Sequence, residues 1–132
     1  MRALRFVLRL FALVIFAVSA LHLVLGVRAD YLLGAIVPAS VAQDPSLDSQ
    51  NRFYGVAFSL FGAVLYLCST DLKRYEPVFN AALLCFFLGG LARLVSWATH
   101  GAPAPLVIVL AASELLFPPV LFLWVRSMRS AA

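Results

Sequence analysis

The chain has 132 residues, 64% of them apolar and 12% charged, with a formal net charge of +4. Soluble domains are about one quarter charged, and a domain this small has too little interior to hide so many apolar side chains, so the composition excludes a water-soluble globular protein. The basic residues lie at the ends of apolar runs rather than in a stripe, as membrane orientation signals do, and we therefore expect no nucleic-acid partner.

Four apolar runs are long enough to cross a membrane, which predicts an all-α, four-helix transmembrane bundle in one domain over residues 1–132. The runs cover residues 6–27, 53–69, 78–98 and 106–125. About 20 helical residues at 1.5 Å each cross roughly 30 Å of hydrocarbon. The second run is short, but Asp44 followed by Pro45 is typical of a helix N-terminus, so we expect that helix over residues 45–69.

The segment between the first two runs, residues 28–52, is expected to lie outside the membrane as a lid. A connection this long in so small a protein usually has a function. Its apolar part, residues 31–37, is far too short to span the membrane. We expect it to lie in the membrane interface or to cap the bundle from outside.

Prolines predict the boundaries of the later helices. Glu76 and Pro77 indicate the start of the third spanning helix in the same way as Asp44 and Pro45 do for the second. The glycine and the two prolines within residues 100–105 predict a tight turn between the third and fourth helices.

Basic residues predict which helix ends face the cytoplasm. Only Arg28 and Arg52 lie on one side of the predicted bundle. The other side carries seven basic residues: Arg2, Arg5, Arg9, Lys73, Arg74, Arg126 and Arg129. Because cytoplasmic segments are enriched in Lys and Arg, we expect a multi-pass protein of the bacterial inner membrane with both termini in the cytoplasm.

A cleaved signal peptide is the alternative interpretation of the N-terminal segment. Arginines precede an apolar run there, and Val27–Ala29 resembles a cleavage site. That run is about 20 residues long, however, whereas the apolar part of a signal peptide usually has about 7–15. We therefore favour an uncleaved first helix.

Polar residues within the runs lie at a similar depth, near the outer side. An ionisable residue at mid-helix costs roughly 2.5–3.5 kcal/mol, so such residues indicate a function. His22 and Arg93 lie roughly 8 Å below the outer helix ends, and Glu114 roughly 12 Å. Each shares a helical face with small residues, which predicts that they point inward. The predicted ligand-binding residues are His22, Asn51, Arg52, Tyr54, Arg93, Ser96, Trp97 and Glu114.

Arg93 and Glu114 are predicted to pair between the third and fourth spanning helices. The prolines at 118–119 remove the donors for the carbonyls of Glu114 and Leu115, which then need other partners in lipid. The guanidinium of Arg93 has enough donors for both the carboxylate and a freed carbonyl. Two interpretations stay open: a structural pair that joins the helices, or a functional pair exposed to a ligand or a proton path.

The other polar positions also have structural alternatives. His22 is either a hydrogen-bonded packing residue or an acid–base group, and together with Glu114 it is the candidate catalytic residue. Trp97 is either a membrane-belt residue or a stacking surface for a ligand. Asn51 and Arg52 either cap the second spanning helix and meet headgroup phosphates, or belong to the binding site.

The chain lacks the patterns of the common cofactor and metal sites. It has no phosphate-binding loop, no Gly-x-Ser-x-Gly elbow and no haem-type pair of histidines. Cys68 and Cys85 lie inside apolar runs without Cys-x-x-Cys spacing, as packing residues do. We therefore predict no cofactor and no metal site.

Three segments resemble a family of small bacterial four-helix membrane proteins, catalogued as domain of unknown function 4345. They are Asn51–Gly55, Phe87–Trp97 and Glu114–Pro119. The resemblance extends over about residues 21–125; it implies a four-helix inner-membrane fold, draws attention to Arg52, Arg93 and Glu114, and implies no activity. Looser likenesses, without a matching motif, are to four-helix sterol-pathway scaffold proteins and to membrane sterol isomerases.

Three functions are compatible with this polar cluster, and we favour the first. The bundle binds a lipid-like or isoprenoid ligand, or a membrane-enzyme partner, at Arg52, Arg93 and Glu114. Alternatively, it is an isomerase-like enzyme acting on a lipid, with a proton on Glu114 and His22 as its counterpart. The third function is a small proton-coupled transporter. Membrane lipids are the expected partners, and a homo-oligomer stays open because small residues such as Gly55 suit a dimer as well as a compact bundle.

Overall fold

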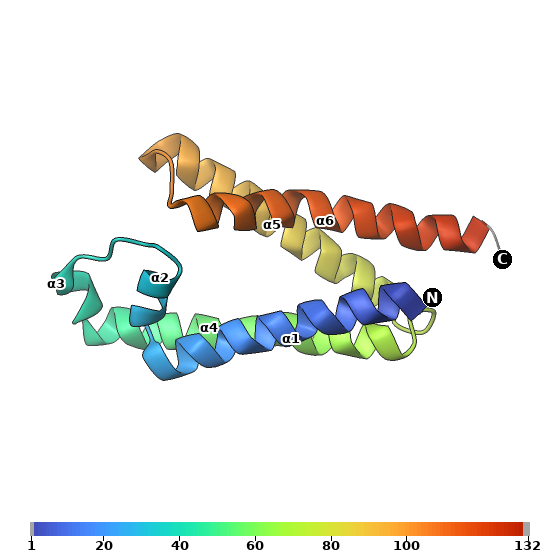
Figure 1. Cartoon of the computed structure of the whole chain (residues 1–132), viewed down its shortest axis with the longest axis horizontal. Helices are drawn as coiled ribbons and strands as arrows, with labels where there is room; N and C mark the ends of the chain where they lie inside the picture. Colours follow the sequence, from blue (N-terminus) through green and yellow to red (C-terminus); the bar gives the residue numbers. More distant parts are fainter. Residues whose placement is uncertain (1, 131–132) are drawn as a thin grey trace. The chain divides into compact units, whose positions relative to one another are not determined.

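The computed structural model describes residues 2–130, which form α-helices and connecting segments without strands (Figure 1). The helices are α1 Arg2–Leu25, α2 Arg28–Leu32, α3 Ala39–Ala42, α4 Pro45–Thr70, α5 Glu76–His100 and α6 Pro105–Ser130. The chain divides into two compact units, unit 1 over Met1–Phe79 and unit 2 over Asn80–Ala132. Unit 1 therefore holds α1 to α4 and the first residues of α5, and unit 2 holds the rest of α5 together with α6.

Four helices, α1, α4, α5 and α6, are long and apolar enough to cross a membrane. This confirms the predicted fold class. The helices extend beyond several of the predicted spans: α1, for example, begins at Arg2 rather than at residue 6. Helical hydrogen bonding does not stop where the apolar run stops, so a helix ends at its caps instead. The single-domain organisation stays a prediction.

Helices α1 and α4 pack side by side in unit 1 (Figure 1). The buried stripe of α1 consists of Leu4, Leu8, Ala12, Ile15 and Ser19. Spacings of three and four residues place these side chains on one helix face. Small residues let α4 come close: a Cβ added to Gly62 would lie 3.2 Å from the Ala12 carbonyl oxygen. Many of the other side chains of both helices are apolar and exposed, as a lipid-facing surface requires.

The predicted starts of α4 and α5 are confirmed. The Asp44 carboxylate accepts hydrogen bonds from the backbone nitrogens of Ser46 (2.8 Å) and Leu47 (3.0 Å). Pro45 occupies the first turn of α4, where no intrahelical donor is needed. α5 begins at Glu76, directly before a proline. Helices α4 and α5 therefore begin where the sequence indicates.

Helices α5 and α6 form a hairpin (Figure 1). The predicted tight turn between them is present at residues 101–104 and leads into α6 at Pro105. Gly101 has a φ of +91°, a left-handed backbone conformation that other residues rarely adopt. The prolines at 118–119 lie inside α6 without ending it.

The segment that connects α1 to α4 covers one end of that helix pair. Gly26, with a φ of +56°, ends α1, and its nitrogen donates to the His22 carbonyl oxygen at 2.8 Å. The chain then turns into α2, which contacts α1. Farther along, the Tyr31 hydroxyl donates to the Val37 carbonyl oxygen at 2.5 Å. The location of this segment in the membrane interface stays a prediction.

Candidate functional site

A polar network joins α1, α2 and α4 at the end of unit 1 where α1 stops. We call it the α1–α4 network, and it consists of His22, Asp30, Asp48, Asn51 and Arg52. α1 supplies His22 from its last turn, α2 supplies Asp30, and the first two turns of α4 supply the other three. These residues come together because Gly26 reverses the chain after α1.

Within the network, Asp30 links all three helices. His22 Nδ1 lies 2.9 Å from the Val18 carbonyl oxygen, which only accepts hydrogen bonds, so Nδ1 carries the proton. The other ring nitrogen, Nε2, lies 3.6 Å from Asp30 Oδ1. Asn51 Nδ2 donates to the second oxygen, Asp30 Oδ2, at 2.9 Å. The imidazole is packed against Gly55, where an added Cβ would lie 2.3 Å from the His22 Cβ.

Arg52 caps the C-terminus of α1 rather than its own helix. Its guanidinium donates to the carbonyl oxygens of Leu23 (2.6 Å) and Val24 (3.0 Å), which have no intrahelical partner. Its Nε donates to Asp48 Oδ2 at 2.7 Å. A positive charge at this position also complements the negative end of the helix dipole. The interpretation of Arg52 as a cap of the second spanning helix is therefore wrong, because its side chain spans to the neighbouring helix.

Asp48 also connects α4 to the chain just after the end of α1. Its Oδ1 accepts a hydrogen bond from the Val27 backbone nitrogen at 3.1 Å. A Cβ on Gly26 would lie 1.9 Å from that same oxygen, so only glycine allows the carboxylate to approach the chain here. Gly26 thus provides both the left-handed turn and the space for Asp48.

An open hollow of about 310 Å³ lies beside the network and includes two of its residues. We call it the Arg28–Arg52 hollow. Its charged lining residues are Arg28, Asp44, Asp48 and Arg52, and its apolar lining residues include Val24 and Leu25 from the end of α1. The side chain of Arg28 is exposed and has no hydrogen bond or ion pair with the described residues. Two positive and two negative charges therefore surround a space that begins where the apolar helix ends.

Two buried polar atoms of unit 1, Ser19 Oγ and Asn51 Oδ1, have no hydrogen-bond partner among the described residues. Leaving a buried polar group unpaired costs about 1–3 kcal/mol. The amide nitrogen of Asn51 already binds Asp30, so its free oxygen is a hydrogen-bond acceptor held in a fixed orientation.

In unit 2, Arg93 of α5 and Glu114 of α6 form the predicted ion pair. Arg93 Nε donates to Glu114 Oε2 at 2.7 Å, and the second bond, from Nη2 to Oε1, is 3.0 Å. This two-pronged geometry is the strongest that arginine and a carboxylate form. The Glu114 side chain is 11% exposed and that of Arg93 is 40% exposed. A Cβ on Gly90 would lie 3.1 Å from the Glu114 Cβ, so a small residue lets the helices approach here.

Three predicted site residues take no part in these contacts within the described structure. Tyr54 is 65% exposed and stacks edge-on against Phe53, with 5.7 Å between ring centroids. Ser96 and Trp97 of α5 are also exposed. The structure thus joins His22 with Asn51 through Asp30, and Arg93 with Glu114. A single pocket shared by all eight predicted residues stays a prediction.

Sequence reasoning missed Asp30 and Asp48. The four-residue spacing of Asp48 and Arg52 was an available signal, since side chains at that spacing are neighbours on a helix. No comparable signal marks Asp30, because its contacts depend on the turn after α1. Over residues 2–130, no three histidine, cysteine or carboxylate side chains are arranged to hold a metal ion.

These features define a multi-pass membrane protein with an all-helical fold and polar groups held between neighbouring helices. A family model described as a domain of unknown function, DUF4345, matches residues 3–125. The chain belongs to this family, as the three segments noted in the sequence predict. No curated protein matches the chain. No solved structure matches it either.

Proposed function

We propose that the protein binds the polar head of a membrane lipid in the Arg28–Arg52 hollow and acts as a lipid-binding accessory protein. The observation that carries this proposal is Arg28, which makes no hydrogen bond or ion pair with the described residues and lines a 310 Å³ hollow at the end of an apolar helix. Lipid headgroups occupy that level of a membrane when α1 spans it.

The charges around the hollow indicate the class of headgroup. Arg28 acts on Asp48 only through its charge and makes no hydrogen bond or ion pair with the described residues, whereas Arg52 is held by Asp48 and by the end of α1. Arginine recognises phosphate with a fork of donors. Asp44 uses one carboxylate oxygen for its capping bonds, which leaves the other as an acceptor for an amino or hydroxyl group. A phosphate-containing head that also carries an amine, such as phosphatidylethanolamine, suits this balance.

The connecting segment supplies apolar side chains for contact with the membrane. Leu32 and Ile36 are exposed, Ile36 to 97%. Apolar residues of this kind insert into the boundary between headgroups and acyl chains. The segment would thereby hold the hollow against the lipid surface and act as the lid that its length suggests.

Arg28→Gln tests this proposal, because it removes a charge of the hollow without breaking any hydrogen bond or ion pair among the described residues. We expect the full-length protein in detergent to bind phosphatidylethanolamine about tenfold more weakly, since a hydrogen bond to a charged group contributes about 1.5–3 kcal/mol. Lipid titration followed by native mass spectrometry measures this affinity. Arg74→Gln, the same charge change at the other end of α4, is the control and should bind as the parent does. Equal binding by all three proteins, or no enrichment of any lipid over bulk membrane, would exclude the hollow as the site.

We also propose that both termini lie in the cytoplasm of a bacterial inner membrane, from the basic residues at the N-terminal end of α1 and in the 71–75 connection. A reporter enzyme that folds only outside the cytoplasm should be inactive when fused to the C-terminus. The same reporter inserted after Val37 should be active. The reverse pattern would overturn the orientation.

A further inference from the structure

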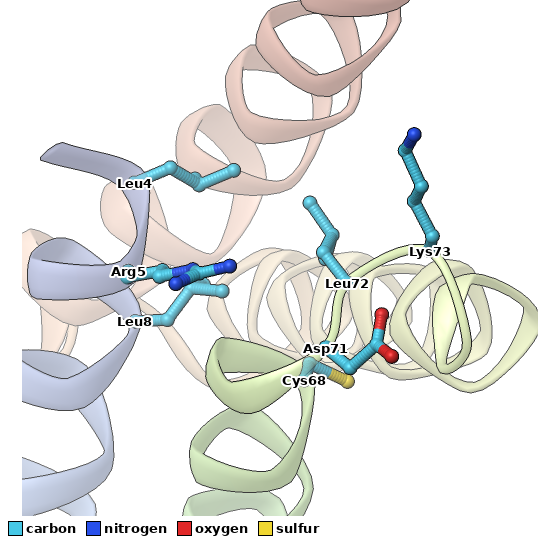
Figure 2. A pocket seen from close by; sticks show the side chains of 7 residues that line it. All are labelled: Leu4, Arg5, Leu8, Cys68, Asp71, Leu72 and Lys73. Atoms are coloured by element: carbon cyan, nitrogen blue, oxygen red, sulfur yellow. The ribbon is translucent and has the colours of Figure 1, made fainter. Parts of the chain in front are cut away.

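A second pocket, at the opposite end of unit 1 from the α1–α4 network, is also lined by basic side chains. It has a volume of about 130 Å³ and lies between the start of α1 and the connection after α4 (Figure 2). Arg5, Asp71 and Lys73 are its charged lining residues, and Leu4, Leu8 and Leu72 are apolar ones. In Figure 2 the α1 side chains extend toward the segment that carries Leu72, and Lys73 extends away from Asp71 and Cys68.

The basic residues near this pocket divide into those with structural contacts and those without. Arg9 donates to Ser69 Oγ at 3.2 Å and lies over the Tyr66 ring, 6.0 Å from its centroid. Arg74 lies over the Tyr75 ring at 5.5 Å. The Arg9 contacts join α1 to α4, whereas the Arg74 contact is with its neighbour in the chain.

Arg5 and Lys73, by contrast, have no ion pair or hydrogen bond with the described residues, although both line the pocket. Asp71 accepts a hydrogen bond from the Arg74 backbone nitrogen at 3.1 Å, so its orientation is fixed by the turn. Two cations and one anion give the pocket a net charge of +1, which matches the single negative charge of a phosphodiester. Leucines beside the charges offer an apolar wall for the glycerol and first methylene groups of a lipid.

We propose that this pocket binds the phosphodiester of an anionic phospholipid from the leaflet at the N-terminal end of α1. Basic pockets beside membrane helices recognise anionic headgroups in this way. The site is independent of the Arg28–Arg52 hollow, since the two share no residue. Its ligand is anionic, whereas the hollow has balanced charges.

The test compares phosphatidylglycerol with phosphatidylcholine of the same acyl chains, titrated onto the full-length protein in detergent and followed by native mass spectrometry. We expect the parent to prefer phosphatidylglycerol. The double variant Arg5→Gln with Lys73→Gln should bind it about thirtyfold more weakly, since each basic residue at an anionic surface contributes about fivefold. The control, Arg2→Gln with Arg74→Gln, removes the same charge outside the pocket and should keep the preference.

A second variant separates the pocket from general surface charge. Leu72→Trp adds bulk to the lining and leaves every charge in place, so it should weaken phosphatidylglycerol binding while helix content, measured by circular dichroism, stays unchanged. Equal losses in both charge variants, or full binding by Leu72→Trp, would overturn the proposal. Displacement of the lipid by inorganic phosphate at equal concentration would also overturn it, because a free phosphate would then be the ligand.

Discussion

Gly55→Ala is expected to destabilise the packing of α1 against α4 more than the same change at Gly62, the other glycine of α4. The new Cβ would lie 2.3 Å from the His22 Cβ, a distance that real Cβ atoms essentially never show. A Cβ moves only with its backbone, so the two helices must separate or tilt. Overpacking of this kind costs typically about 2 kcal/mol. The Asp30 contacts of His22 and Asn51 should loosen with it, because all three helices meet there.

Gly89→Ala is the matched control, since its added Cβ meets only Glu114 Oε2, at an ordinary distance of 3.9 Å. Both substitutions gain the same helix propensity, about 1 kcal/mol. The difference in stability between the two variants therefore reports the steric clash at Gly55 alone. Thermal unfolding of the purified proteins in detergent measures it. If Gly55→Ala is as stable as Gly89→Ala, the close packing of α1 on α4 is wrong.

The second large effect is expected at the ion pair of unit 2. Arg93→Leu leaves the carboxylate of Glu114, whose side chain is only 11% exposed, without its partner. Removing one member of a buried pair costs about 3–5 kcal/mol, and a charge inside a membrane span adds to the penalty. We therefore expect Arg93→Leu to unfold at markedly lower denaturant concentration than the parent, and Glu114→Leu to behave similarly.

The double variant, Arg93→Leu with Glu114→Leu, should recover most of this loss. It removes both charges, and replacing a whole buried pair with apolar residues is often nearly neutral. A double-mutant cycle in mixed micelles measures the coupling. If the stability loss of the double variant equals the sum of the two single losses, the two side chains do not stabilise each other. That result would contradict the two-pronged ion pair.

The same pair bears on the acid–base hypothesis for Glu114. Both of its carboxylate oxygens are bound by Arg93, at 2.7 and 3.0 Å. Proton transfer between Glu114 and a ligand would therefore require the pair to open first. His22 has its described contacts with Val18 and Asp30 instead. The two candidate catalytic residues thus each have a structural partner, which is why lipid binding is the better-supported proposal.

Many of the site residues could be predicted from the sequence, because they are either costly charges inside apolar runs or capping residues defined by their neighbours. Arg93 and Glu114 stand out because a charge in an apolar run is costly, and opposite charges on successive helices satisfy each other. Asp44 and Pro45 stand out because capping chemistry depends on neighbouring residues. Arg52 was noticed as well, but neither alternative left open for it included the end of α1, since nothing in the local sequence indicates which carbonyls a long side chain reaches.

The sequence by itself determined that this chain has four membrane-spanning helices, because apolar length and composition decide which solvent each segment requires. It also determined the turn residues and the cap of α4. Only the tertiary structure decided that Asp30 joins three helices and that Arg52 closes the end of α1. The Asn51–Asp30 and Arg52–Leu23 contacts join residues 21 and 29 positions apart, and they depend on Gly26, which turns the chain back with a positive φ. The free energy of such contacts depends on the path of the backbone between them, which residue type and spacing alone do not specify.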